Sequence, residues 1–267
     1  MIKILMNELI KRIKIRASEN LLIEKIISII RMIIILFLTI LARFDLRKEI
    51  AKKKTIEDYI NLSLSYNYTP IKGFRFKLII SALQIKNELQ KFIELVAKCQ
   101  PQVVLEIGTA KGGTFFLLTK FSSPSAHLIS LDLPGGQFGG GYSQWEGYFF
   151  KSFALDTQKI SIIRADSHES STLKKLKKIL KDKLIDVLFI DGDHSYEGVK
   201  KDFEMYHPLV KTGGIIAFHD IVVHPPDINC NVNKFWNEIK HKYESKEFVE
   251  NWDQKKCGIG FIIKKNG

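Results

Sequence analysis

The chain has 267 residues, of which 45% are hydrophobic and 26% charged, as expected for a globular protein with one large domain and an appendage. Lys and Arg outnumber Asp and Glu by 41 to 29, and the net charge of +12 suits an anionic membrane or an acidic ligand. No Arg-Gly-rich tract or zinc-ligand spacing accompanies this charge, so no nucleic-acid partner is expected. The three cysteines, Cys99, Cys230 and Cys257, are scattered, which indicates reduced thiols in a cytoplasmic protein.

Residues 1–79 are predicted to form an N-terminal helical segment. Its apolar stretch IISIIRMIIILFLTILA, at 26–42, contains one arginine and has basic residues on both sides. The charge-free run at 32–42 is shorter than the ~20 residues that cross a bilayer. Three interpretations remain open. The helix packs against the domain or against a second copy of the chain in a homo-oligomer, residues 21–54 make peripheral contact with an anionic membrane on its cytoplasmic face, or the helix spans the membrane.

From about residue 80 onward, short apolar runs alternate with amphipathic helical stretches. This alternation predicts an α/β domain at 80–267, built on a parallel sheet with helices on both faces. The expected strands are 103–108, 127–133, 160–166, 186–192 and 213–220. Ser195 is a plausible N-cap for the helix that follows the fourth strand.

An acidic residue stands near the end of each of these five strands. They are Glu106, Asp132, Asp166, Asp191 and Asp220. The carboxyl ends of parallel strands meet at one edge of a sheet, where ligands bind. A single strand-end Asp is as readily a helix cap, but five acids at one edge indicate a functional site.

The turn EIGTAKGGT at 106–114 discriminates between cofactors. Its glycines do not follow the dinucleotide pattern G-x-G-x-x-G, and Glu106 would repel a pyrophosphate. A ligand with an ammonium and a sulfonium group would tolerate that carboxylate. Asp132 can accept both hydroxyls of a ribose, and Asp166 with Ser167 can bind an adenine amino group. Together these features describe S-adenosylmethionine.

At this point the motifs resemble those of class I S-adenosylmethionine-dependent methyltransferases. VVLEIGTAKGGT resembles motif I of that superfamily, which assigns Gly108, Thr109, Gly112 and Gly113 to the cofactor site. DVLFIDGDHSYEGVKKDF and GGIIAFHDI resemble a small bacterial and archaeal branch that often acts on sugars. The resemblance implies a Rossmann-like, doubly wound sheet of seven strands, mostly parallel, in which GIGFIIKK forms the antiparallel strand.

The DGDH sequence also resembles metal-dependent O-methyltransferases such as the catechol and caffeoyl-CoA enzymes. In that group an Asp after the fourth strand binds a divalent cation, and a base follows three residues later. The resemblance gives Asp191 the metal position, beside the cofactor, and His194 the role of general base. His219 and Asp220 would complete a site for Mg²⁺ or Mn²⁺, although His219 departs from the oxygen donors of the family. The alternative for His194 is a loop histidine bonded to a backbone carbonyl.

The expected reaction is methyl transfer from S-adenosylmethionine to a hydroxyl, with a sugar or glycan as the acceptor implied by the resemblance. The glycine-rich loop at 133–145 and HPPDINC at 224–230 are candidate walls of the acceptor pocket. A small phenolic diol or an amine is the alternative acceptor. A protein that binds the cofactor without catalysis, as a sensor or assembly subunit, is the hypothesis from another class, and a nicotinamide-linked oxidoreductase is disfavoured by the glycine spacing.

Overall fold

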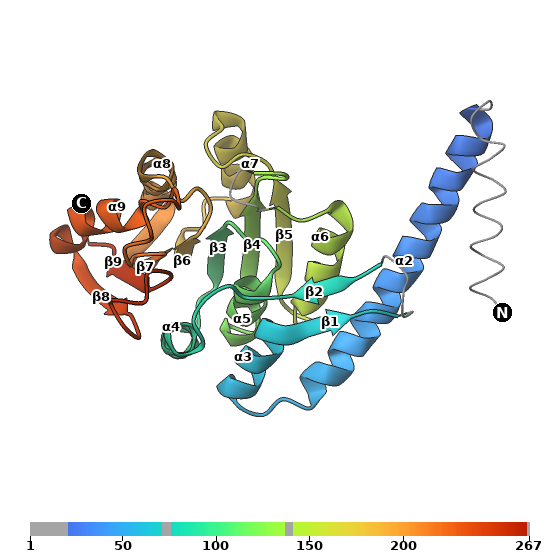
Figure 1. The fold of residues 1–267 in the computed structure, drawn as a ribbon, viewed down its shortest axis with the longest axis horizontal. Helices are drawn as coiled ribbons and strands as arrows, with labels where there is room; N and C mark the ends of the chain where they lie inside the picture. The colour runs from blue at the N-terminus through green and yellow to red at the C-terminus, as the bar shows by residue number, and fades with distance from the viewer. Residues whose placement is uncertain (1–20, 71–75, 137–140, 266–267) are drawn as a thin grey trace.

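The computed structural model describes residues 21–70, 76–136 and 141–265, which form an α/β domain with a long N-terminal helix (Figure 1). Its seven-stranded sheet has the order β5-β4-β3-β6-β7-β9-β8. The strands are β3 (Val103–Ile107), β4 (His127–Asp132), β5 (Lys159–Arg164), β6 (Ile185–Ile190), β7 (Val210–His219), β8 (Glu244–Phe248) and β9 (Ile259–Ile263). Strands β3 to β7 pair in parallel, and β9 is antiparallel to both β7 and β8. The predicted doubly wound sheet is confirmed.

Helices cover both faces of the sheet, because successive side chains of a strand point to opposite faces. In β3, Val104 packs into one core cluster and its neighbour Leu105 into the other. The first cluster includes side chains of α3 (Ile56–Ser65), α4 (Lys86–Cys99), α5 (Gly113–Phe121) and α6 (Gln144–Phe150). The second includes side chains of α7 (Ser170–Leu180), α8 (Tyr196–Tyr206) and α9 (Val232–Ile239). The polar and lysine-rich sides of these helices face outward, as the sequence pattern requires.

The N-terminal segment is joined to the α/β domain through its second half. The N-terminal part of helix α2 (Leu21–Ala51) extends away from the domain, and its C-terminal part packs beside α6 (Figure 1). Ala42 and Leu46 of α2 are fully buried in the first core cluster, together with Ile60 of α3. A short antiparallel pair of strands, β1 (Tyr66–Tyr68) and β2 (Leu78–Ile80), follows α3. The later part of the segment therefore shares its core with the domain.

Local capping fixes the loops at the carboxyl edge of the sheet. The Ser195 hydroxyl accepts a hydrogen bond from the Gly198 amide at 3.0 Å, so the predicted N-cap of α8 is present. Helix α5 begins after Gly112, whose φ of +73° lies in the left-handed region that glycine adopts at little cost. These two turns bring the loops after β3 and β6 together at one edge.

Candidate active site

A cavity of about 630 Å³ lies at the carboxyl ends of the parallel strands, the edge at which such sheets bind ligands. Among its lining residues are most of the side chains that the sequence singled out: Gly108, Asp132, Asp166, Ser167, Asp191, His194, His219 and Asp220. The other predicted cofactor residues, Glu106, Thr109, Gly112 and Gly113, are not among them. The structure thus places eight of the predicted site residues at the cavity and the other four outside its lining.

The turn after β3 depends on glycine because backbone passes close to backbone. A Cβ atom on Gly108 would lie 2.0 Å from the carbonyl oxygen of Asp191, and Gly108 also has a φ of +86°. A Cβ atom on Gly113 would lie 2.0 Å from the amide nitrogen of Ala82. Gly108 thus allows the β3 turn to contact the loop after β6, and Gly113 allows the start of α5 to contact the segment after β2.

Glu106 and Asp132 form an acidic floor beside this turn. Burial raises the pKa of Glu106 well above its usual value, and nearby Asp132 adds to the effect. Its Oε2 has no hydrogen-bond partner among the described residues. Asp132 is 5% exposed, and its Oδ2 accepts a hydrogen bond from the Ala110 amide at 2.5 Å. A cationic ligand above this floor would satisfy carboxylates that burial otherwise destabilises.

Asp166 and Ser167 lie two and three residues beyond the end of β5, in a loop that is hydrogen-bonded to α8. Asp166 Oδ1 accepts a hydrogen bond from the His168 amide at 2.8 Å. The Tyr206 hydroxyl of α8 donates to the carbonyl oxygen of Ser167 at 2.6 Å. The position suits the predicted contact with an adenine amino group, because both residues line the cavity and are fixed through backbone bonds.

Asp191 is oriented from both sides at the end of β6. Its Oδ2 accepts a hydrogen bond from Gln84 Nε2 at 2.9 Å, and Gln84 in turn accepts one from the Thr114 hydroxyl at 2.8 Å. Its Oδ1 lies 3.0 Å from His219 Nδ1. The carboxylate is therefore held at the sheet edge rather than free to rotate.

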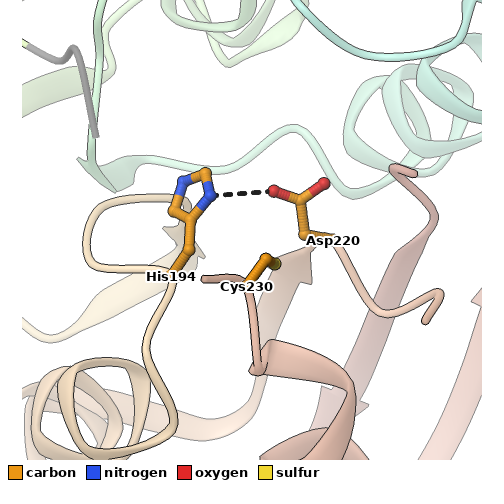
Figure 2. Close-up of side chains that lie close together, drawn as sticks. All are labelled: His194, Asp220 and Cys230. Atoms are coloured by element: carbon orange, nitrogen blue, oxygen red, sulfur yellow. Dashed lines mark ion pairs between the residues drawn. The ribbon is translucent and has the colours of Figure 1, made fainter. Parts of the chain in front are cut away.

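Three imidazoles gather around the carboxylate of Asp220. His194 Nδ1 lies 3.1 Å from Oδ2, while His219 Nδ1 and His224 Nε2 lie 3.4 Å and 3.2 Å from Oδ1. His194 also reaches Asp191, with Nε2 at 3.6 Å from Oδ1. Figure 2 shows His194 and Asp220 pointing toward each other from the loops after β6 and β7. The predicted base and metal residues therefore form one compact ionisable group.

The charges in this group reinforce one another. Burial opposes protonation of His194, but contacts with Asp220 and Cys230 and the nearby Asp191 outweigh it and raise the pKa of His194 to about 10. Burial also works against ionisation of Asp220, yet the imidazole of His219 and the other two rings hold its pKa far below the usual value. Both shifts favour a protonated His194 beside an ionised Asp220 when no metal ion is bound.

The predicted metal set, Asp191, His219 and Asp220, does not fit a hard cation well. Mg²⁺ favours an octahedral cage of oxygen atoms, whereas this set provides two carboxylates and one imidazole. His219 Nδ1 lies 3.0 Å from Asp191 Oδ1, a hydrogen-bond distance, and 3.4 Å from Asp220 Oδ1, the distance of an ion pair. The donor chemistry thus favours a hydrogen-bonded network at these three residues, and no step of the reaction is assigned to Mg²⁺ or Mn²⁺ here.

Sequence patterns missed two residues of the site, Gln84 and Cys230. Gln84, which orients Asp191, lies in the segment between β2 and α4, where the sequence predicted no strand. His224 and Cys230 occur in HPPDINC, which was predicted to form a wall of the pocket; His224, the reserve candidate for the base, does line the cavity. Cys230 was interpreted as an ordinary reduced thiol. Its position after the strand that carries Asp220 was the available signal.

A family model described as "Methyltransferase domain" matches residues 105–221. Uncharacterized protein R132 of Acanthamoeba polyphaga mimivirus is 42% identical over 67 residues, which cover 24% of this chain and 30% of that protein. Uncharacterized protein y4gI of Sinorhizobium fredii is 25% identical over 149 residues, 54% of this chain and 16% of that protein. The matches therefore span less than a third of the length of either relative.

Two solved structures with a similar fold are described as an O-methyltransferase and a putative O-methyltransferase. TomG from Streptomyces achromogenes, involved in tomaymycin synthesis and solved in complex with S-adenosylmethionine, has a TM-score of 0.52 and 13% identity, covering 80% of this chain and 91% of its own. A putative caffeoyl-CoA O-methyltransferase from Staphylococcus aureus has a TM-score of 0.51 and 20% identity, covering 84% and 99%. At these identities the similarity is one of fold.

Proposed function

We propose that the chain is a class I S-adenosylmethionine-dependent methyltransferase that transfers the cofactor's methyl group to a hydroxyl oxygen, because a family model described as "Methyltransferase domain" matches residues 105–221. One observation carries this proposal. The same cavity is lined by the predicted cofactor residues Gly108, Asp132 and Asp166 and by the ionisable pair His194–Asp220. Cofactor and acceptor would therefore meet in one enclosed space, where proximity can contribute ~7–11 kcal/mol.

The chemistry requires the acceptor to lose a proton as the new bond forms. The hydroxyl oxygen attacks the methyl carbon, the carbon–sulfur bond breaks, and its electron pair stays on sulfur to give the demethylated product. His194 was predicted to take the hydroxyl proton, which only a neutral imidazole can do. Because Asp220 holds the imidazolium form, that proton must first be displaced. We place acceptor activation at this pair.

A hydroxyl-rich acceptor, such as a sugar or glycan, suits the polar groups that line the cavity. Asp193, His194, His224 and Lys256 line it and provide both donors and acceptors of hydrogen bonds. Leu83 and Ile228 add aliphatic surface. A small phenolic diol is the second candidate acceptor, because the structure of a putative caffeoyl-CoA O-methyltransferase has a similar fold.

Transfer of a labelled methyl group tests the proposal directly. Purified protein is incubated with labelled S-adenosylmethionine and either fractionated cell-envelope glycans or a catechol. We expect label in a glycan fraction, bound through an alkali-stable ether. Label in catechol alone would replace the sugar acceptor by the diol. Tight cofactor binding with no transfer to any acceptor would contradict catalysis and support a binding or assembly protein.

Helix α2 supports a separate proposal about location. Within the described residues, it is the single helix long and apolar enough to cross a membrane, at Glu24–Ala51. Its exposed side is apolar over several turns, including Ile26, Ile30, Ile33, Phe37 and Phe44. Its buried side faces the domain. A surface helix normally exposes polar side chains to water, so the exposed apolar face of α2 needs a partner.

We infer that the partner is the surface of an anionic bilayer. The C-terminal part of α2 and the residues after it are basic, at Arg43, Arg47, Lys48 and 52–54. Basic side chains next to an exposed apolar face suit peripheral attachment to anionic lipid. Phe37→Asp should reduce co-sedimentation with phosphatidylserine vesicles, whereas Trp252→Asp, at an exposed aromatic residue elsewhere, should not. A full-length chain that ignores these vesicles and dimerises through α2 would contradict the proposal.

A further inference from the structure

The loop that leads into α9 brings a thiol to the imidazole cluster. Cys230 is 6% exposed and lies beside His194 and Asp220 (Figure 2). One ligand atom from each of these three residues lies within 4.8 Å of the other two. His194 follows β6, Asp220 follows β7 and Cys230 precedes α9, so tertiary folding assembles the group.

The hydrogen-bond geometry of His224 leaves a gap that a cation would fill. Its Nδ1 lies 3.0 Å from the carbonyl oxygen of Val222, a contact that requires a proton on Nδ1 because a carbonyl only accepts. Its Nε2 lies 3.2 Å from Asp220 Oδ1, which also only accepts when ionised. Either a second proton or a metal ion must therefore lie between Nε2 and the carboxylate.

Whether a proton or a metal ion compensates Asp220 must also be asked for His194 and His219, the other two rings that face it. If His194, His219 and His224 were all protonated, three cations would surround the carboxylates of Asp220 and Asp191 in a largely buried site. Burying charge is unfavourable unless it is well compensated. Neutral His194 and His224, the Asp220 carboxylate and a Cys230 thiolate around one divalent ion would each be in the form that binds metal, which leaves His219 as the single ring that can carry a proton beside the carboxylates.

We propose that His194, Asp220 and Cys230 bind a divalent transition-metal ion, and that His224, which contacts Asp220 at 3.2 Å but is not part of that three-residue group, joins them as the fourth donor when the ion binds. Zinc accepts this combination of imidazole, carboxylate and thiolate in tetrahedral geometry. A thiolate discriminates against Mg²⁺, which prefers oxygen. The bond from His224 Nδ1 to the Val222 carbonyl is the kind of outer contact that fixes the tautomer and orientation of a metal-binding histidine.

This assignment changes the role of His194 in the proposed reaction. A ligand's ring nitrogen is not available to accept the proton of a hydroxyl, so the ion would lower the acceptor's pKa instead. The inference about metal binding does not depend on methyl transfer, because it concerns an equilibrium that needs neither cofactor nor acceptor. Failure of either proposal would leave the other standing.

Cobalt substitution tests the ligand set. The full-length protein is freed of metal with a chelator, loaded with Co²⁺ and dialysed, and its metal content and absorption spectrum are measured. We expect a single tightly bound cobalt per chain, with a near-ultraviolet charge-transfer band from a cobalt–thiolate bond. Cys230→Ser should abolish the band, because oxygen replaces sulfur with little change of shape. His194→Ala should weaken cobalt binding at least ~10-fold.

The other two cysteines provide matched controls. Cys257→Ser probes the neighbouring group formed by His219, Asp220 and Cys257, and Cys99→Ser probes an exposed thiol. Both variants should keep the band. Loss of the band in Cys257→Ser, its persistence in Cys230→Ser, or a wild-type chain that retains no cobalt would overturn the proposal. Circular dichroism shows whether each variant is folded. If Cys230→Ser does not fold, the cobalt affinity of His194→Ala tests the site independently.

Discussion

Asp132 offers the sharpest test of the cofactor site, because one atom of its side chain can be changed with little change of shape. Asp132→Asn keeps a carbonyl oxygen that can accept the hydrogen bond from the Ala110 amide. The turn after β3 should therefore survive. The substitution removes the negative charge and replaces one acceptor with a donor, so a ribose hydroxyl loses its charged partner.

The structure sets the expected size of the effect. Asp132 is 5% exposed, so bulk water would not replace the lost interaction. A hydrogen bond to a charged group contributes ~1.5–3 kcal/mol, which corresponds to Kd values weaker by ~10- to 150-fold. Asp132→Ala should cost more, because it also removes the acceptor of the Ala110 amide and loosens the turn.

Titration calorimetry with S-adenosylhomocysteine measures the affinity without turnover. Asp156→Asn is the matched control, since Asp156 is exposed on the loop before β5. We expect the control to bind like wild type, and NAD to bind to neither protein. If Asp132→Asn binds as tightly as Asp156→Asn while both remain folded, Asp132 does not hold the ribose and the reasoning from strand ends is refuted.

Three further predictions concern catalysis, packing and pH. His194→Ala should lower kcat on the true acceptor by ~10²–10⁴ while leaving the Kd for S-adenosylhomocysteine unchanged; near-normal turnover would exclude a role in activating the acceptor. Gly108→Ala should lower Tm and cofactor affinity far more than Gly213→Ala, because both have positive φ but only Gly108 would place a Cβ against backbone; equal Tm losses would contradict this. Burial lowers the pKa of His127 to about 4, so the folded state resists a proton that the unfolded state takes up near pH 6.5. Stability should therefore fall from pH 6.5 toward 4, and His127→Gln, but not the exposed His241→Gln, should flatten the dependence of Tm on pH in that range.

The sequence alone determined the layered architecture. The inner strands are short continuous apolar runs because both of their faces are buried, and the lysine-rich stretch of α7 has apolar residues at helical spacing, so run length and periodicity together indicate the element types. The antiparallel position of β9 came from the resemblance to a family rather than from periodicity. The short β1–β2 pair was not predicted, because three-residue strands carry too little pattern to detect.

The sequence also located much of the candidate site, for a topological reason. Parallel strands bring their carboxyl ends to one edge, so Asp132, Asp191 and Asp220 converge whatever the loops do. This reasoning gave the identity of the residues that line the cavity. It gave no information about which neighbours compensate their charges.

Only the tertiary structure decided those neighbours. Whether His194 is a neutral base or a charged partner depends on its 3.1 Å approach to Asp220 and on the thiol of Cys230, groups 26 and 36 residues farther along the chain. Protonation and metal preference depend on distances, burial and the sum of nearby charges, and none of these is set by local spacing. Sequence periodicity therefore specified the sheet that carries the acids, while packing of the loops against one another determined the chemistry available at its edge.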